Sequence, residues 1–265
     1  MVSVIIPTFN SSAYLKDCLK SVSKYKDVKE IIISDDCSDQ ENITSLKNII
    51  FKSPFRNKIK LNENSSNKGA FYNKLDAVKN AENDLIYLLD SDNIAGFNID
   101  DVFRRIDKIG DESKLFIPSK IYHFYNYVNY LTPIYKTINR KFELFSKEDL
   151  VINSSQIRKI FQGGENIMSD KNKSIYWVLN IGNFILFKDN FLLNIKNELN
   201  FSREILSMDA VAFTYYWLKK NNELFLLNDH YHFHRKRMDS VSWTERESSK
   251  ISRNHFDNLF LDIGN

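Results

Sequence analysis

The chain has 265 residues, enough for one large α/β domain, and its 43% hydrophobic content allows a packed core. Its formal net charge is +3, from 37 basic and 34 acidic side chains, and this near balance argues against bulk electrostatic binding of nucleic acid. No apolar run approaches the roughly 20 residues that cross a bilayer. The first residues have a strand pattern, so we expect no signal peptide. The only cysteines, Cys18 and Cys37, fit a reduced, cytoplasmic protein and provide no Cys/His metal spacing.

The first 90 residues alternate between strand and helix patterns. Apolar runs predict strands at 2–6, 30–33, 59–61 and 85–89, and apolar residues at helical spacing predict helices between them, over 11–22, 43–50 and 69–81. Four strands separated by three helices indicate a parallel, doubly wound sheet with right-handed crossovers and helices on both faces.

The pattern is less regular after residue 92. We expect a helix at 99–109, a strand at 115–118, and an irregular elaboration over the sheet edge from about 123 to 174. Strands at 176–180 and 183–187 around Gly182 should precede a helix that Ser207 caps and that runs to Lys219. A strand at 224–227 leads into an alternating strand at 231–235, and we expect a final helix that carries Ile251, Phe256, Leu259, Phe260 and Ile263. Since no linker separates these elements, we predict a single domain over 1–265.

Three of the first four strands end in polar clusters: Thr8-Phe9-Asn10, Asp35-Asp36 and Asp90-Ser91-Asp92. The carboxyl ends of parallel strands meet at one edge of the sheet, where ligands bind in open α/β folds. Asp90 and Asp92 are two apart, so their side chains point to the same side. A Mg²⁺ or Mn²⁺ ion would relieve their repulsion and hold a diphosphate. The alternative is an ordinary polar turn, since Asp, Ser and Asn are turn formers. No Gly-x-Gly-x-x-Gly or P-loop motif occurs.

These motifs resemble, in order, those of the family 2 glycosyltransferases with the GT-A fold. The matching pieces are Val4-Ile5-Ile6-Pro7-Thr8-Phe9-Asn10; Ser34-Asp35-Asp36-Cys37-Ser38-Asp39; Asn67-Lys68-Gly69 with Asn73 and the run from Asp84 to Asp92; Ser207-Met208-Asp209; and the aromatic and basic stretch from Tyr231 to Ser242. The chain departs from the family at Tyr72, where an arginine that touches the nucleotide is common and for which Lys68 or Lys74 is the candidate substitute. It also departs at Met208, where Glu is usual, and at Asn93, where Asp is common.

The resemblance implies a GT-A fold with a Rossmann-like, mostly parallel central sheet and a C-terminal acceptor-side elaboration. It implies a nucleotide-sugar-binding half at 1–95 and an acceptor-binding half at 96–265. It further implies an inverting transfer of a sugar from a nucleoside diphosphate, UDP foremost, to a saccharide or lipid-linked saccharide acceptor in bacterial surface polysaccharide (capsule or O-antigen) synthesis. Expected partners are the nucleotide sugar and the saccharide acceptor, with peripheral contact at the cytoplasmic face of the membrane or with other polysaccharide-synthesis proteins.

The resemblance also assigns the site residues. The expected nucleotide contacts are Pro7, Thr8, Asn10, Asp35, Asp36, Lys68, Asp90 and Ser91. The expected ligands of Mn²⁺ or Mg²⁺ are Asp92, Asp90 and His234, and the expected diphosphate or acceptor contacts are His232, Arg235 and Trp177.

Asp209 is the candidate general base that takes the acceptor's proton, because inversion needs one such base and no protein nucleophile. Each assignment has a structural alternative. Asp209 could only stabilise a helix start, and Trp177 could only pack. Two other functions remain open: a non-catalytic nucleotide-binding domain, and a nucleotidyltransferase, although the segment 7–12 has neither the Gly nor the basic residue of such a phosphate loop.

Overall fold

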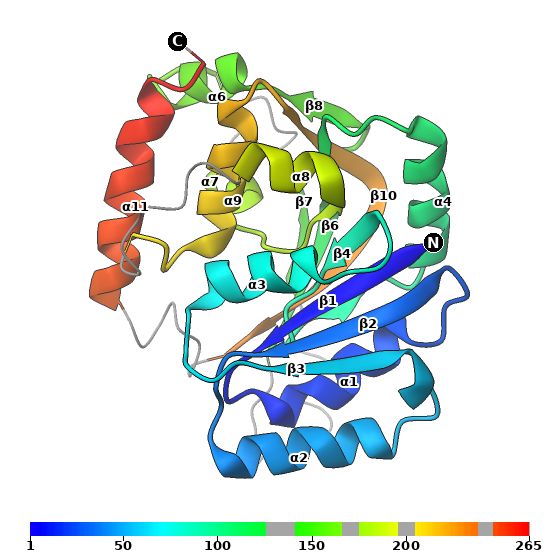
Figure 1. Ribbon diagram of the computed structural model, residues 1–265. Coiled ribbons are helices and arrows are strands. Elements are labelled where there is room, and N and C mark those ends of the chain that lie inside the picture. Colours follow the sequence, from blue (N-terminus) through cyan, green and yellow to red (C-terminus); the bar gives the residue numbers. More distant parts are fainter. Residues whose placement is uncertain (126–140, 166–174, 196–204, 238–245, 265) are drawn as a thin grey trace.

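The computed structural model describes residues 1–125, 141–165, 175–195, 205–237 and 246–264. Its centre is a ten-stranded mixed sheet in the order β3-β2-β1-β4-β9-β6-β10-β5, with β7 paired to β6 and β8 to β10 (Figure 1). The strands are β1 (Val2–Thr8), β2 (Val28–Asp35), β3 (Ile59–Glu63), β4 (Leu85–Leu88), β5 (Ile94–Ala95), β6 (Lys114–Tyr125), β7 (Lys141–Leu144), β8 (Leu150–Ile152), β9 (Ile185–Phe187) and β10 (Glu223–Lys236).

Helices cover both faces of this sheet. They are α1 (Ser12–Val22), α2 (Gln40–Phe51), α3 (Ala70–Lys79), α4 (Ile99–Ile109), α6 (Ser154–Phe161), α7 (Tyr176–Leu179), α8 (Lys188–Ile195), α9 (Asp209–Lys219) and α11 (Arg246–Leu261), with a short 3-10 helix at Arg56–Lys58. The apolar faces of α1, α2 and α4 share one buried cluster, and those of α3, α6, α7, α8, α9 and α11 share the other. Along β1, Val4 and Ile6 face the first cluster and Ile5 faces the second, as the alternation of a strand requires.

The predicted βαβ organisation of the first 90 residues is confirmed. The strands β3, β2, β1 and β4 are adjacent and parallel, with a continuous register from Ser3–Glu30 to Thr8–Asp35 across the β1–β2 pair. Because all four run the same way, Thr8, Asp35 and Asp90 come to the same edge of the sheet. In Figure 1 the carboxyl ends of β1 and β2 lie below the start of α3.

The strand predicted at 176–180 is wrong, because residues 176–179 form the helical turn α7. Leu179 N–H donates to the Ile175 carbonyl (3.2 Å) and Asn180 N–H to the Tyr176 carbonyl (3.0 Å). Tyr176 and Leu179 are buried, whereas Trp177 is 45% exposed. A run of four apolar residues carries too few turns to distinguish the two periods, so long-range packing against α9 decides the outcome.

The irregular elaboration predicted at 123–174 is also incorrect where the chain is described, because β7, β8 and α6 lie there; residues 126–140 and 166–174 lie outside the described residues. The strand predicted at 115–118 continues to Tyr125 as β6, which pairs with β10 on both sides of Pro118. The register between these strands shifts at Pro118, between Leu227 and Tyr231, because proline has no N–H to donate to the ladder.

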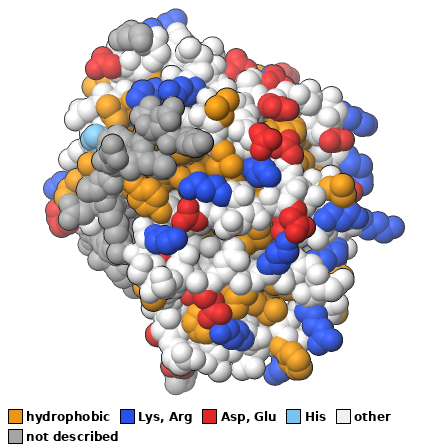
Figure 2. Space-filling model, viewed as in Figure 1, with side chains coloured by type: hydrophobic (Ala, Val, Ile, Leu, Met, Phe, Trp, Pro, Cys, Tyr) orange, Lys and Arg blue, Asp and Glu red, His pale blue; other side chains and the backbone are white. Residues whose placement is uncertain are grey.

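One helix-end prediction needs correction. Met208, not Ser207, precedes α9, and no side chain caps that helix. The predicted final helix is present as α11, in which Phe256 is buried and Ile251 is 46% exposed. Within the described residues, no helix is both long and apolar enough to span a membrane. On the face shown in Figure 2, basic and acidic side chains are interspersed, in keeping with the near balance of charge.

Candidate active site

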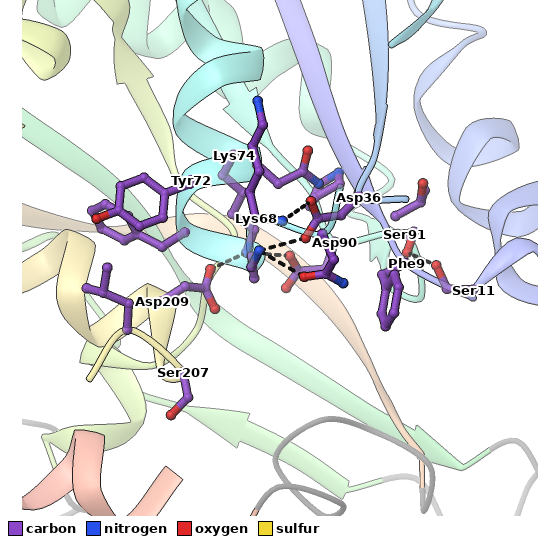
Figure 3. Close-up of a pocket in the computed structure, with 18 of the residues that line it drawn as sticks. Phe9, Ser11, Asp36, Lys68, Tyr72, Lys74, Asp90, Ser91, Ser207 and Asp209 are labelled. Atoms are coloured by element: carbon purple, nitrogen blue, oxygen red, sulfur yellow. Dashed lines mark hydrogen bonds and ion pairs between the residues drawn. The ribbon is translucent and has the colours of Figure 1, made fainter. Parts of the chain in front are cut away.

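A cavity of about 320 Å³ opens at the carboxyl ends of β1 and β4, between α3 and the start of α9 (Figure 3). Both halves of the chain line it: residues from 7 to 92 form one side, and residues from 180 to 249 form the other. Eight of the predicted site residues line this cavity: Pro7, Thr8, Asp36, Lys68, Asp90, Ser91, Asp92 and Asp209. The other predicted residues lie outside its lining: Asn10, Asp35, Trp177, His232, His234 and Arg235.

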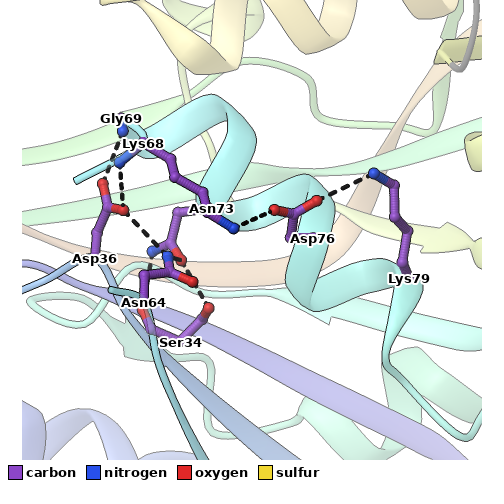
Figure 4. A network of polar contacts seen from close by, with 8 residues as sticks. All are labelled: Ser34, Asp36, Asn64, Lys68, Gly69, Asn73, Asp76 and Lys79. Carbon is purple, nitrogen blue, oxygen red and sulfur yellow. Dashed lines mark hydrogen bonds and ion pairs between the residues drawn. The ribbon is translucent and has the colours of Figure 1, made fainter. Parts of the chain in front are cut away.

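Asp36 fixes the start of α3 to the sheet (Figure 4). Its carboxylate accepts hydrogen bonds from the backbone N–H groups of Lys68 and Gly69, both at 2.8 Å, and from Asn64 Nδ2 at 3.1 Å. Since α3 has no side-chain cap of its own, this carboxylate satisfies N–H groups at the positive end of the helix. Asn64 also donates to Asn73 Oδ1 at 3.0 Å, which ties the loop to the middle of α3.

Lys68 lines the cavity, but its ammonium contacts Asp76 Oδ2 at 2.8 Å on the outer side of α3 (Figure 4). Both side chains are exposed to solvent, so this ion pair contributes little to stability and can exchange for another anion.

Asp35 and Asn10 lie outside the cavity lining and connect the loops that form its wall. Asp35 is fully buried and accepts from Thr8 Oγ1 (3.0 Å), Ser38 N–H (2.8 Å) and Ser38 Oγ (2.5 Å). Asn10 has a φ of 47°, its N–H donates to Ser38 Oγ (2.8 Å), and its side-chain oxygen accepts from Asp39 N–H (3.0 Å). These bonds join the loops after β1 and β2, so both residues act here on the shape of the wall.

Phe9 lines the cavity but was not among the site residues predicted from the sequence. Its ring is 45% exposed and lines the cavity at the end of β1, close to the hydrogen-bonded hydroxyls of Ser11 and Ser91 (2.8 Å; Figure 3). The sequence feature that could have identified Phe9 is a large apolar residue placed between the polar residues Thr8 and Asn10 at the end of a predicted strand. Such a ring offers a flat surface for a nucleotide base.

The backbone of the Asp90–Asn93 turn is fixed by hydrogen bonds within the turn and to Asn183 and Arg235. Asp90 N–H donates to Asn183 Oδ1 (3.1 Å), and Asn93 N–H donates back to the Asp90 carbonyl (2.9 Å). The Arg235 guanidinium donates from Nε to the Asp92 carbonyl (2.7 Å), and Arg235 N–H donates to Asn93 Oδ1 (3.0 Å). The turn is therefore preorganised, with both carboxylates directed to the cavity.

Each carboxylate of this turn has a basic partner. Lys74 Nζ lies 2.7 Å from Asp90 Oδ1 and 2.7 Å from Asp209 Oδ2, whereas Arg237 Nε lies 3.0 Å from Asp92 Oδ2. Burial by itself lowers the pKa of Lys74, but Asp209 and Asp90 outweigh it, and the pKa of Lys74 is raised. Burial raises the pKa of Asp92 to about 6, against the opposing effect of Arg237. Arg237 was not among the site residues predicted from the sequence.

Arg235 is buried beneath the turn. One guanidinium nitrogen lies 3.2 Å from Asp17 Oδ2, and the guanidinium carbon is 5.1 Å and 4.7 Å from the ring centroids of Tyr14 and Phe124. Its donors hold the Asp92 backbone, so in this structure it supports the turn.

The other predicted residues of β10 and α7 lie outside the cavity lining and near one another, because the His123 ring contacts both Trp177 (6.1 Å) and His234 (5.4 Å). His232 is buried, its Nε2 is 3.1 Å from Asn183 Nδ2, and burial lowers its pKa well below the ordinary value. The His234 ring lies 6.0 Å from that of His232. Lys236 lies over the Trp177 ring at 5.9 Å.

The donor set for a metal ion consists of the two carboxylates Asp90 and Asp92. Among the described residues, no group of three or more His, Cys, Asp and Glu side chains is arranged to hold a metal, so Asp90, Asp92 and His234 do not form one. Mg²⁺ commonly uses one or two carboxylates together with substrate phosphates and water. The pair at this cavity fits a metal held jointly with a diphosphate.

Comparison with solved structures defines the fold as GT-A. Staphylococcus aureus TarS residues 1–349 in complex with UDP-GlcNAc matches 98% of this chain and 70% of that chain, with a TM-score of 0.61 and 19% identity. The complex with UDP has a TM-score of 0.59 over 98% of this chain and 69% of that one, at 18% identity. GalNAc-T7 with UDP, GalNAc and Mn²⁺ has a TM-score of 0.60 at 14% identity, over 90% of this chain and 44% of that chain.

The family follows from the sequence itself. The profile described as Glycosyl transferase family 2 matches residues 3–155, more than half of the chain, and the chain belongs to this family. It is 33% identical over 98 residues, or 34% of its length, to the poly(ribitol-phosphate) beta-N-acetylglucosaminyltransferase TarS of Staphylococcus aureus. That match spans 16% of the relative's length.

Proposed function

We propose that the chain is an inverting glycosyltransferase that moves a sugar from a nucleoside diphosphate, UDP foremost, to a saccharide or lipid-linked saccharide acceptor in bacterial surface polysaccharide synthesis. The observation that carries this proposal is the meeting of Asp90, Asp92 and Asp209 at one cavity that both halves of the chain line. UDP and UDP-GlcNAc complexes of structural relatives support the choice of donor, and the activity named for TarS supports a surface-polymer acceptor.

Donor binding falls to the first half of the chain together with Arg237 from the second half. Phe9 stacks on the base, and Asp36 and Ser91 offer polar contacts on the same side. Arg237 presents a guanidinium beside the candidate metal ligand Asp92, where a diphosphate would lie. Asp90 and Asp92 would hold Mg²⁺ or Mn²⁺, which when bound supplies neutralisation of the charge on the leaving diphosphate.

Transfer needs one proton acceptor on the other side of the cavity, and Asp209 fills this role. The acceptor hydroxyl oxygen bonds to the sugar's anomeric carbon as the bond from that carbon to the diphosphate oxygen breaks, and the electron pair leaves with the diphosphate. Asp209 takes the hydroxyl proton at its carboxylate. Its place in the first turn of α9, on the half that we assign to the acceptor, puts the base opposite the donor-binding turn.

Asp209→Asn tests this assignment, because the amide keeps the shape and an oxygen for Lys74 but cannot take the proton. We expect turnover with UDP-GlcNAc and a saccharide acceptor to fall ~10²–10⁴-fold, while the calorimetric Kd for UDP with Mn²⁺ stays near that of the parent. Asp111→Asn is the matched control, since Asp111 is also paired with a lysine, Lys114 at 2.5 Å, but lies outside the cavity lining. Full turnover in Asp209→Asn would move the base elsewhere, and absence of nucleotide binding and turnover in the parent would favour a non-catalytic role.

A further inference from the structure

A single buried ammonium joins the two sides of the cavity. Lys74 Nζ lies 2.7 Å from Asp90 on the donor-binding turn and 2.7 Å from Asp209 at the start of α9 (Figure 3). Only 4% of the Lys74 side chain is exposed, compared with 32% for Asp90 and 18% for Asp209. The lysine is therefore fixed by its surroundings, whereas both carboxylates reach into the cavity.

The elements that hold Lys74 are themselves well anchored. The α3 helix that carries it is fastened at its start by Asp36 and packs on α9 through the Phe71 and Phe213 rings, stacked 4.4 Å apart. The position of Lys74 relative to α9 is thus set by core packing and does not depend on the ion pairs alone.

The chain also leaves room for this cluster. Gly182 has a φ of 75°, and a Cβ atom there would lie 3.2 Å from Asp90 Oδ2, 3.6 Å from Ala210 Cβ and 4.0 Å from Lys74 Nζ. A left-handed glycine lets the backbone before β9 approach both the carboxylate and the helix start. The backbone at Gly182 therefore packs directly against this cluster.

We propose that Lys74 is a positioning residue: its ammonium holds the Asp209 carboxylate in a fixed place relative to Asp90, so that the base is aligned with the donor bound at the turn. This inference rests on the proposed function, since it takes Asp209 as the base. A positive charge that only neutralised the two carboxylates would not need to fix their positions relative to each other. An ammonium with two short contacts from a buried, anchored stem fixes the direction of both partners.

The test is a double-mutant cycle between Lys74→Met and Asp209→Asn, with turnover and the Kd for UDP measured for all four proteins. Misplacement of a reacting group by about 1 Å costs up to ~10²-fold, so we expect Lys74→Met to lower kcat by ~10- to 100-fold with the UDP Kd within about threefold of the parent. Because the lysine acts through the base, the double variant should be no slower than Asp209→Asn alone. Lys74→Arg keeps the charge and two donors and should recover most of the lost kcat.

Lys58→Met is the matched control. Lys58 Nζ contacts the carbonyls of Ser23, Tyr25 and Val28 at 3.5, 3.1 and 2.9 Å, away from the cavity, so its loss should lower the melting temperature and leave kcat unchanged. Parent-like kcat in Lys74→Met, or losses that add in the double variant, would overturn the inference while the base assignment stands. A raised UDP Kd with unchanged kcat would also overturn it, by assigning Lys74 to donor binding through Asp90.

If Lys74→Met does not fold, the question is decided by Lys74→Arg and by the double variant, which buries one carboxylate charge fewer. A kcat of Lys74→Arg like that of the parent supports the positioning role. A kcat of Lys74→Arg no higher than that of the double variant contradicts the positioning role. Unchanged turnover in Asp209→Asn is a different outcome, because it refutes the proposed base itself.

Discussion

Acidification should destabilise this protein through His230, a buried histidine on β10. The side chain is fully buried, and in the described part of the chain neither ring nitrogen has a hydrogen-bond partner; the Tyr87 ring lies against it, 6.2 Å between centroids. Burial lowers the pKa of His230 from 6.5 to about 3. The folded protein therefore keeps this imidazole neutral at pH values where the unfolded chain protonates it.

The sign and size follow from that difference. Between pH 6.5 and about 3 the unfolded state binds one more proton at this site, so the contribution is fully present above pH 6.5 and is lost as the pH falls. At pH 5.5, one unit below the unfolded pKa, the expected loss in the free energy of unfolding is about 1.4 kcal/mol. The pKa of His232 is also lowered by burial, and it adds a loss of the same sign.

Urea titrations at pH 7.5 and 5.5 measure this loss, with His230→Leu as the comparison. Leucine fills a similar volume and cannot bind a proton, so the variant should lose about 1.4 kcal/mol less than the parent between the two pH values. Other groups that titrate in this range, such as Asp92, contribute equally to the change in unfolding free energy of both proteins, so their contributions cancel when parent and variant are compared. If parent and variant lose the same stability, His230 does not stay neutral in the folded protein and the burial argument fails.

Three further substitutions test the cavity. Asp92→Ala should abolish transfer, and by calorimetry it should weaken UDP binding in the presence of Mn²⁺ but not in EDTA. The melting temperature should stay nearly unchanged, since the residue follows a strand. Activity like that of the parent would support the interpretation of 90–92 as an ordinary polar turn. Phe9→Ala should weaken UDP binding by roughly 5- to 150-fold if its ring stacks on the base, whereas Phe51→Ala, 70% exposed on α2, should not. Gly182→Ala should cost roughly 1–3 kcal/mol in urea titration, because its φ is 75° and its Cβ would lie 3.2 Å from Asp90 Oδ2; an unchanged midpoint would show that the backbone relaxes there.

The first half of the fold was predictable because its signals are local. Each of its strands is a short apolar run, and each is followed by a helix with one apolar face. The right-handed crossover rule then leaves few arrangements. Because that rule makes the strands parallel, the sequence by itself places Thr8, Asp36 and Asp90 at one edge of the sheet.

The second half depends on pairings between distant segments, which local patterns do not encode. The length of β6 is set by β10, more than 100 residues later, and the turn α7 is decided by packing against α9. A run such as 176–179 is compatible with either period, so only the completed core selects one.

Within the site, the sequence predicted which segments meet, but it could not predict which neighbour faces the cavity. Asp35 turns inward to Thr8 and Ser38, and Asp36 turns to the start of α3 and lines the cavity. Arg235 supports the turn from beneath, while Arg237 lines the cavity beside Asp92. Asp36 and Arg237 each follow the last residue of their strand, where the alternation of side chains no longer fixes the side.

Lys74 shows where a sequence signal was present but not used. The buried residues of α3 include Phe71, Leu75 and Val78, and position 74 lies one turn from both Phe71 and Val78 on the same face. A lysine on that face is costly to bury unless carboxylates from other elements reach it. Its presence among apolar positions therefore implied acidic partners across the helix interface, and Asp90 and Asp209 are the carboxylates that meet it there. A charged residue on the apolar face of a predicted helix is thus a marker of where two parts of a site are joined.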